Sequence, residues 1–408
     1  MNYLATSDRF FGDESGGGYR IAWELAKAIR DEGHEVSLLC GSLPQDGPIG
    51  PSWIDNICVI RYRFPETFSL NPARQLLHIH AAKKAAYRWL ADRQWDVIHS
   101  HMLYSGLAAF AVLGQRSLRI STVHSSAVLE QRINWSNQGF AGRVKLLAGQ
   151  KLISRAEFRL FSIADRLHVL SDFTRQTVTS LYGGGIAAKI QKVPWWQDPR
   201  STRLSKEEAR RKLGWPLHEA VFLTLRRMVP RMGLDVFLSA LENLAEKHNF
   251  TAVLAGDGPE RARLMQRIST GRLTSRVLFP GRMPESELPL AYQAADAFVL
   301  PTIALEGFGI IILEAWANGC PVIASNIGAI SELLQPISPQ CLVEPANAQA
   351  LNEILERVLT GSLKLPRPEE LMNHVAGRYS RHILLPEYLR LLTAPIDTSE
   401  TPDTGLLI

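Results

Sequence analysis

The chain has 408 residues, of which 46% are hydrophobic and 21% charged, a balance that excludes an intrinsically disordered protein. This length is enough for two or three domains, each with its own core. Four scattered cysteines exclude a disulfide scaffold, and the formal net charge of +5 combines a basic first half with a mildly acidic second half.

The first half alternates short apolar segments with segments of helical periodicity. Residues 2–6 predict a first strand, and the segment from Gly17 predicts a helix that ends at Gly33. Further strands are predicted at residues 35–40, 96–99, 120–124 and 166–170. Strands separated by helices are typical of βαβ units, in which the strands form a parallel sheet.

The same alternation starts again after a linker that contains Pro194 and Pro199. Strands are predicted at residues 221–225, 251–255, 277–279, 297–300 and 321–324. A long helical pattern covers about residues 369–392, and the polar residues after it contain prolines that favour disorder.

The sequence therefore predicts an α/β protein with two facing Rossmann-like domains. The N-terminal domain is expected at residues 1–195 and the C-terminal domain at 196–370. A C-terminal helix at 371–393 is expected to cross back to the N-terminal domain, with a disordered tail at 394–408. Ligands of such proteins usually bind at the carboxyl ends of the strands, so an inter-domain cleft is the expected site.

The segment Glu306-Gly307-Phe308-Gly309, which opens an apolar helix containing Glu314, is the most informative motif. Glycines at a helix start let the backbone approach a ligand and expose N–H groups to an anion such as a diphosphate. The Glu314 carboxylate could accept hydrogen bonds from two adjacent ribose hydroxyls, and Glu306 could face a transferred group. The alternative is that both glutamates are solvated and the glycines serve only packing.

With its flanks, this motif resembles glycosyltransferase family four, whose members are retaining nucleotide-sugar transferases of the GT-B fold. Glu306 and Glu314 match the family's pair of glutamates separated by seven residues. The resemblance runs from Gly16 to about Leu392. The blocks that carry it are residues 16–18, 24–27, 33–36, 96–101, 171–174, 255–259 and 279–281.

The resemblance implies roles for four residues of the first half. Gly16 and Gly17 would close over the nucleotide sugar, although a plain flexible turn is the alternative. His124 ends a predicted strand, and the resemblance implies that it contacts the donor sugar. His101, also at a strand end, could contact the acceptor. A lone histidine is more often structural, and that alternative remains for both.

A basic segment, Arg226-Arg227-Met228-Val229-Pro230-Arg231-Met232, follows the first strand of the second half. Arg227 matches the family's phosphate-binding arginine. The family usually has lysine at the position of Met232, which cannot bind phosphate, so Arg231 is expected to replace it and Arg226 is a further candidate. Since the sequence contains no Asp-x-Asp pair, we expect no metal or other cofactor, and cations and helix N-termini would stabilise the leaving group.

Two regions mix basic and apolar residues in the first half. One is Arg132–Arg166, with Trp135, Phe140, Phe158 and Phe161 among its cations; the other includes Arg61, Arg63, Arg74, Lys83, Lys84, Arg88 and Arg93. They suit an anionic acceptor or peripheral contact with an anionic membrane, or they are the solvated faces of packed helices. Without a signal peptide or an apolar span of about 18–20 residues, a cytoplasmic protein is expected, with contact to the inner face of the membrane as an option.

The expected function is transfer of a hexose from a nucleoside-diphosphate sugar to an acceptor hydroxyl, in polysaccharide, glycolipid or glycoconjugate biosynthesis. Glu306, His124 and Arg227 are the expected catalytic residues. The acceptor could be a sugar, a lipid-linked saccharide or a metabolite; no nucleic-acid partner is expected. Two alternatives remain: a binding partner that has lost catalysis, which Met232 and the unusual Trp195-Trp196 pair would explain, and a Rossmann oxidoreductase, against which the absence of G-x-G-x-x-G counts.

Overall fold

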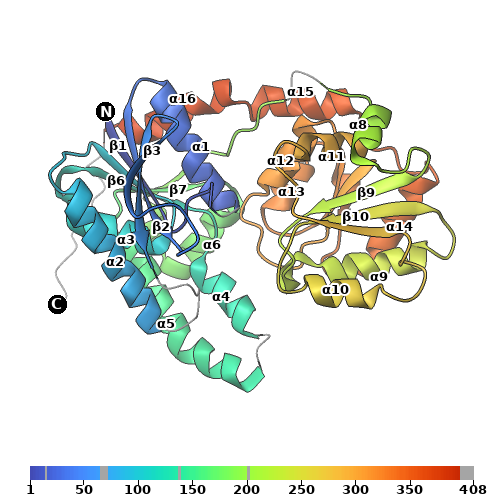
Figure 1. Cartoon of the computed structure of the whole chain (residues 1–408), viewed down its shortest axis with the longest axis horizontal. Helices are drawn as coiled ribbons and strands as arrows, with labels where there is room; N and C mark the ends of the chain where they lie inside the picture. The colour runs from blue at the N-terminus through green and yellow to red at the C-terminus, as the bar shows by residue number, and fades with distance from the viewer. Residues whose placement is uncertain (14–15, 65–71, 137–138, 200–202, 396–408) are drawn as a thin grey trace. The chain divides into compact units, whose positions relative to one another are not determined.

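The computed structural model describes residues 1–13, 16–64, 72–136, 139–199 and 203–395, with the side chains of 72–74, 134–136 and 139–148 excepted. The chain forms two compact α/β units (Figure 1). Unit 1 is Met1–Pro194 together with the segment that begins at Leu385, and unit 2 is Trp195–Leu384. Most of the tail predicted to be disordered, residues 396–408, lies outside the described residues.

Unit 1 is built on an eight-stranded sheet with the strand order β3-β4-β2-β1-β5-β6-β7-β8. The neighbouring strands are parallel except β3 and β4, which form an antiparallel hairpin around Asp55 and Asn56. Both of these residues have positive φ, as a tight hairpin turn requires. The strands are β1 (Asn2–Ser7), β2 (Glu35–Ser42), β3 (Gly50–Ile54), β4 (Ile57–Arg63), β5 (Val97–Ser100), β6 (Leu118–Val123), β7 (Arg166–Val169) and β8 (Ile190–Lys192).

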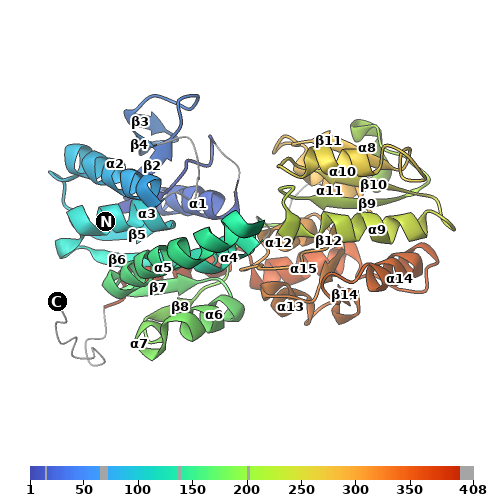
Figure 2. The same cartoon turned by 90° about the horizontal axis from the view of Figure 1, so that it is seen from below.

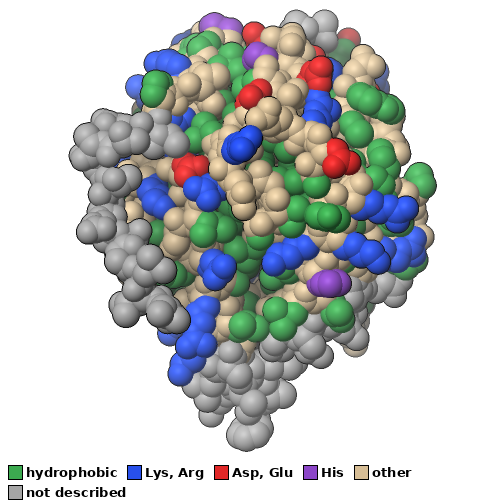
Figure 3. All heavy atoms as spheres, turned by 90° about the vertical axis from the view of Figure 1, so that its left-hand side faces the viewer, with side chains coloured by type: hydrophobic (Ala, Val, Ile, Leu, Met, Phe, Trp, Pro, Cys, Tyr) green, Lys and Arg blue, Asp and Glu red, His purple; other side chains and the backbone are tan. Residues whose placement is uncertain are grey.

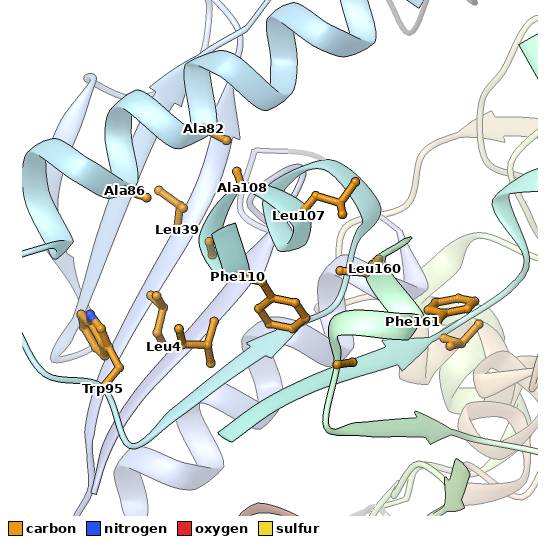
Figure 4. Close-up of a cluster of buried hydrophobic side chains, with 14 of the residues drawn as sticks. Leu4, Leu39, Ala82, Ala86, Trp95, Leu107, Ala108, Phe110, Leu160 and Phe161 are labelled. Atoms are coloured by element: carbon orange, nitrogen blue, oxygen red, sulfur yellow. The ribbon is translucent and has the colours of Figure 1, made fainter. Parts of the chain in front are cut away.

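Helices cover both faces of this sheet (Figures 1 and 2). Leu4 of β1 and Leu39 of β2 pack against Ala82 of one helix and Phe110 of the next, and the small alanine lets its helix approach the strands closely (Figure 4). Burial of each such leucine is worth roughly 1.5–3 kcal/mol. The helices are α1 (Gly17–Asp31), α2 (Pro72–Leu90), α3 (Leu103–Leu113), α4 (Ala127–Ser136), α5 (Gly139–Ile163), α6 (Asp172–Tyr182) and α7 (Gly184–Ala187).

Unit 2 has a six-stranded parallel sheet with the order β11-β10-β9-β12-β13-β14. Its strands are β9 (Ala220–Leu225), β10 (Phe250–Ala255), β11 (Val277–Gly281), β12 (Ala297–Leu300), β13 (Val322–Ser325) and β14 (Leu342–Val343). Its helices are α8 (Lys206–Leu213), α9 (Leu234–Leu244), α10 (Arg261–Arg267), α11 (Leu288–Ala294), α12 (Ile310–Ala317), α13 (Ala329–Leu334), α14 (Ala348–Leu359) and α15 (Pro368–Arg378).

In each sheet the strand order reverses direction at one point. In unit 1 this switch point lies between β1 and β5, and in unit 2 it lies between β9 and β12. The loops after the two strands at a switch point diverge to opposite faces of the sheet and leave room for a ligand. The residues that follow β1, β5, β9 and β12 are therefore the first place to look for a functional site.

The C-terminal part differs from the single helix predicted at 371–393. Two helices form, α15 and α16 (Arg381–Thr393), with a break at Tyr379 and Ser380. The linker satisfies the backbone at this break: the Tyr379 carbonyl accepts from the backbone N–H of Gln197 at 2.7 Å, and the Arg381 N–H donates to Asp198 Oδ1 at 2.8 Å. These bonds replace those that a continuous helix would make.

From Leu385 onward α16 belongs to unit 1, as the expected return of the chain requires. Tyr388 of α16 packs edge-on against His168 of β7, with the ring centroids 5.0 Å apart. The Arg166 guanidinium donates to backbone carbonyls near the end of α16, including that of Leu391. The helix therefore completes the face of the unit 1 sheet that carries His168.

Candidate functional site

The predicted site residues of unit 2 lie in two loops at its switch point. One loop, residues 226–233, follows β9, and the other, residues 301–309, follows β12. The Ile303 N–H donates to the Arg231 carbonyl at 2.9 Å and joins the two loops. A Cβ on Gly233 would lie 1.8 Å from the Pro301 carbonyl oxygen, so this close approach requires glycine.

Glu306 forms an ion pair with Arg226, in which Oε2 lies 2.8 Å from Nη2. The side chains are only 17% and 7% exposed, respectively, so the pair is weakly screened by water. The backbone carbonyl of Glu306 accepts from Ala329 N–H at 3.0 Å, next to Gly328, where a Cβ would come within 2.6 Å of the same oxygen. Both ends of Glu306 are therefore fixed.

Arg227 and Arg231 occupy different environments. Arg227 is exposed, and its side chain has no hydrogen-bond or ion-pair partner among the described residues, which leaves it available to a ligand. Arg231 is half-buried, and its Nη1 donates to the Leu305 carbonyl at 2.9 Å. Leu305 has a φ of 51°, an unfavourable conformation for this residue type, and the arginine helps to hold it.

Phe308 and Gly309 form the entry to α12. The Phe308 side chain is buried, and Gly309 adopts a φ of 88° at the N-cap. Gly309 has no side chain with which to cap α12, and the Ile312 N–H donates to the Gly309 carbonyl at 2.8 Å. The N–H groups before Ile312 therefore receive no cap from the N-cap residue. The N-terminus of a helix favours negative charge. The structure therefore places a helix start beside the arginine-rich loop, an arrangement that suits an anion.

Glu314 lies one turn further along α12 and is half-buried. The hydroxyl of Tyr292, a fully buried residue of α11, donates to Glu314 Oε2 at 3.1 Å. Sequence reasoning missed Tyr292 because it lies 22 residues before its partner and the contact depends on how α11 and α12 pack.

The predicted histidines of unit 1 lie together at the carboxyl ends of β5 and β6. His101 and His124 stack with their ring centroids 5.7 Å apart, and the ring nitrogens of both are buried without a partner in the described part of the chain. Burial lowers the pKa of His124 to about 3 and that of His101 well below its usual value, so both are neutral at pH 7. A buried polar atom without a partner is costly, so hydrogen bonds from or to a ligand hydroxyl would stabilise these nitrogens.

Gly16 and Gly17 lie at the N-terminus of α1, where Gly16 is the N-cap residue. A Cβ on Gly18 would lie 2.5 Å from the Met102 side chain and 3.1 Å from the His124 ring, so glycine lets α1 begin directly against His124.

A hydrogen-bonded chain crosses one face of the unit 1 sheet beneath these residues. It runs from Tyr3 through His99, Thr122 and His168 to the carbonyl of Val193, with bonds of 2.7–2.9 Å. Sequence reasoning placed His99 at a strand end but missed the roles of Tyr3 and His168. Their shared face follows from the two-residue period of strands, which was the available signal.

Asp8, after β1, was also missed. Its carboxylate accepts from the Ser105 N–H at 2.8 Å at the start of α3, so it caps that helix.

The two basic regions of unit 1 are only partly exposed. Arg61 is buried and pairs with Asp13 at 3.0 Å, and Phe161 lies in the core, so neither belongs to a surface. By contrast, Lys83, Lys84, Arg88 and Phe158 are exposed. Arg74, Trp135 and Phe140 have side chains outside the description.

No three His, Cys, Asp or Glu side chains of the described residues come together in a way that could hold a metal ion. Likewise, none of the helices in the described ranges has the length and apolar character needed to cross a membrane.

With the geometry known, family comparisons identify the chain. The model of glycosyltransferase family 4 matches residues 15–198, and the model described as glycosyl transferases group 1 matches residues 205–374. Together the two models span most of the chain. The chain belongs to glycosyltransferase family 4.

Individual relatives are distant. An uncharacterized glycosyltransferase of Methanocaldococcus jannaschii is 30% identical over 41% of this chain, and the match spans only 43% of that protein. The phosphatidyl-myo-inositol mannosyltransferase of Mycobacterium leprae is 24% identical over 93% of each chain. Among solved structures, Anabaena HepE in complex with UDP and glucose has a TM-score of 0.73 at 20% identity, covering 97% of this chain and 100% of that one. This similarity confirms the expected GT-B fold.

Proposed function

We propose that the protein transfers a sugar from a nucleoside-diphosphate sugar to an acceptor hydroxyl, and that unit 2 binds the donor. The arrangement of unit 2 carries this proposal: a part-buried Glu306–Arg226 pair, the exposed Arg227 and the start of α12, with glycine at its N-cap, lie together at the switch point. Cations and helix N-termini bind phosphates without a metal ion. The similar HepE structure is a complex with UDP and glucose, which supports the same class of donor.

In this proposal each predicted residue has one role. Arg227 binds the diphosphate, with Arg231 as the second predicted cation, and Glu314 accepts from the ribose hydroxyls. Glu306 and the amides of Phe308 and Gly309 orient the sugar. In unit 1, the amides of Gly16 and Gly17 approach the donor phosphate, His124 contacts the sugar and His101 the acceptor. The unpaired, neutral ring nitrogens of both histidines support contacts with hydroxyl groups.

We propose that transfer retains the anomeric configuration. The bond from the anomeric carbon to the diphosphate oxygen breaks as the acceptor oxygen bonds to the same face of that carbon. The departing phosphate takes the proton of the acceptor hydroxyl, so no nucleophilic side chain is needed. The arginines stabilise the charge that develops on the leaving group, a type of contribution that is often the largest single one in catalysis.

The experiment is a titration of the protein with UDP and GDP by calorimetry, followed by a screen of nucleotide sugars for hydrolysis and transfer. Binding of a diphosphate with turnover of its sugar supports the proposal, and absence of binding contradicts it. Binding without turnover would favour the alternative of a partner protein that has lost catalysis. One observation favours that alternative: Met232 is buried and uncharged where a cation is expected.

The acceptor is the least constrained part of this proposal. Exposed Lys83, Lys84 and Arg88 lie on α2 with the exposed Leu77 and Tyr87, and cations mix with apolar side chains on one face of unit 1 (Figure 3). Such a surface suits an anionic lipid or a lipid-linked acceptor at a membrane surface. We propose that the protein acts at the cytoplasmic face of the membrane, where a reducing environment suits its four free cysteines. Co-sedimentation with anionic and neutral vesicles tests the contact.

A further inference from the structure

The Arg226 side chain occupies a fixed position at the end of β9. Its backbone N–H donates to the Ala255 carbonyl at 3.0 Å, and a Cβ on Gly256 would lie 1.9 Å from the Arg226 carbonyl oxygen. The backbone of Arg226 is thus packed closely against the loop after β10, and the direction of the side chain depends on its own contacts. It points toward the loop after β12.

Three contacts hold the Arg226 guanidinium. Nη2 pairs with Glu306 Oε2 at 2.8 Å, Nη1 donates to Thr302 Oγ1 at 3.1 Å, and Nη2 also lies 2.7 Å from Met232 Sδ. A guanidinium has five N–H groups. In the described part of the chain these contacts account for three of them, which leaves capacity for a ligand.

Met232 lies beneath this guanidinium and is 6% exposed. A lysine side chain along the same path would extend two bonds beyond the position of the sulfur atom. Its ammonium group would then enter the region that the Arg226 guanidinium occupies, facing Glu306. A lysine at residue 232 and the arginine at residue 226 would therefore compete for the same space beside Glu306. Either residue could supply the cation there.

Arg231 is engaged differently. Its Nη1 holds the carbonyl of Leu305, the residue with the φ of 51°, and this contact shapes the backbone just before Glu306. Arg226 instead contacts the Glu306 carboxylate itself. Of the two arginines, Arg226 is the one that reaches the carboxylate expected to face the transferred group.

We propose that Arg226, and not Arg231, is the second phosphate-binding cation of the donor site, and that it takes the place of the missing lysine by lying over Met232. This inference rests on the proposed function. Arg226 neutralises Glu306, which would otherwise repel the diphosphate, and directs its remaining N–H groups to a phosphate oxygen. The exchange of a lysine for methionine at residue 232 then leaves the charge of the site intact.

The test is a charge swap read by calorimetry with UDP and GDP, and with uridine and guanosine as ligands without phosphate. Arg226→Met should weaken binding of the diphosphate about 10–100-fold and leave nucleoside binding unchanged, since a charge-assisted hydrogen bond to phosphate is lost. In the double variant Arg226→Met/Met232→Lys, the new ammonium group should restore most of the loss. Met232→Lys alone should weaken binding, because two cations would compete for one place.

A matched control is Arg263→Met, which also removes an arginine from a carboxylate-paired group of unit 2, but on the exposed side of α10. It should leave diphosphate binding unchanged. If Arg226→Met proves unstable, as a falling melting temperature would reveal, the double variant decides, because it retains a cation opposite Glu306.

Undiminished diphosphate binding by a folded Arg226→Met variant would overturn the inference, as would a folded double variant that binds no better than the single one. Equal losses for diphosphate and nucleoside would also overturn it, since they indicate a structural role. None of these results contradicts the proposed function, provided that the unaltered protein binds a diphosphate and that Arg227→Ala weakens this binding. If the unaltered protein binds none, both proposals fail.

Discussion

The buried hydroxyl of Tyr292 donates to the Glu314 carboxylate at 3.1 Å, and so fixes the orientation of a group expected to hold the donor ribose. Such a bond lowers the cost of ordering the carboxylate when a ligand binds, because its direction is set in advance.

Tyr292→Phe keeps the aromatic ring in the core and removes the hydroxyl that donates this hydrogen bond. We expect the KM for the donor to rise about 10-fold, as for loss of one hydrogen bond to a charged group, with a small change in kcat. Steady-state kinetics and nucleotide titration measure this. A nucleotide that lacks both ribose hydroxyls should bind the variant and the unaltered protein alike. If Tyr292→Phe lowered the affinity for this dideoxy nucleotide as much as for the ordinary one, Tyr292 would act through packing and not through the ribose contact.

Arg227→Ala removes the exposed cation that follows β9. Because no described residue pairs with it, the change should leave the melting temperature nearly unaltered. Turnover should fall by about 10²–10³, the usual effect of removing a group that stabilises developing charge. Kinetics at saturating donor, together with thermal unfolding, measure both effects. Full activity in this variant would exclude Arg227 from the donor site.

Acid should destabilise the protein before its carboxylates titrate. Burial lowers the pKa of His99, His101, His124 and His168, the last to about 4. Below pH 6.5 the unfolded chain therefore binds protons that the folded chain does not, so the free energy of unfolding falls as the pH falls. Each such histidine contributes up to about 1.4 kcal/mol per pH unit.

Urea unfolding between pH 7 and pH 5 measures this slope, and carboxylates with lowered pKa contribute only at more acidic values. His124→Phe should make the slope shallower by about one proton's contribution, because the variant loses one titrating group but keeps an aromatic ring. Constant stability across this range would mean that these histidines titrate in the folded protein with the same pKa values as in the unfolded chain.

Chelation should leave turnover unchanged. In the proposed mechanism arginines and backbone N–H groups balance the charge of the diphosphate, so 10-fold excess EDTA over trace metal has nothing to remove. The measurement compares initial rates with and without EDTA, followed by addition of Mg²⁺ or Mn²⁺. If EDTA abolished activity and either ion restored it, the metal-independent mechanism would be contradicted, because a metal ion would then balance the charge of the diphosphate.

Much of the fold could be predicted because its signals are local. Each strand predicted from a short apolar segment is present, and each helix between them covers a sheet. The missed strands have physical reasons: β8 has three residues and β14 two, too few for a pattern. The hairpin of β3 and β4 was missed although Asp55-Asn56 is a turn signal.

Site residues could be predicted from the sequence only where their type and spacing allow a single assignment. Glycines at a helix start and glutamates at a fixed spacing could be placed from the sequence. The choice among Arg226, Arg227 and Arg231 could not, because neighbouring residues of a loop point in directions that the sequence does not encode. The break between α15 and α16 likewise depends on bonds to a linker about 180 residues earlier.

Unit 2 is continuous in sequence, whereas unit 1 is assembled from two stretches that flank it. A protein ending at Pro194 would therefore lack Tyr388 and expose the His168 ring to water, together with the Val193 carbonyl that Tyr388 also approaches. Trp195–Leu384 can be excised as one fragment, but unit 1 can be isolated only by splicing its last helix back on. The two units therefore differ in how they can be separated: unit 2 as one continuous fragment, unit 1 only after its two stretches are joined.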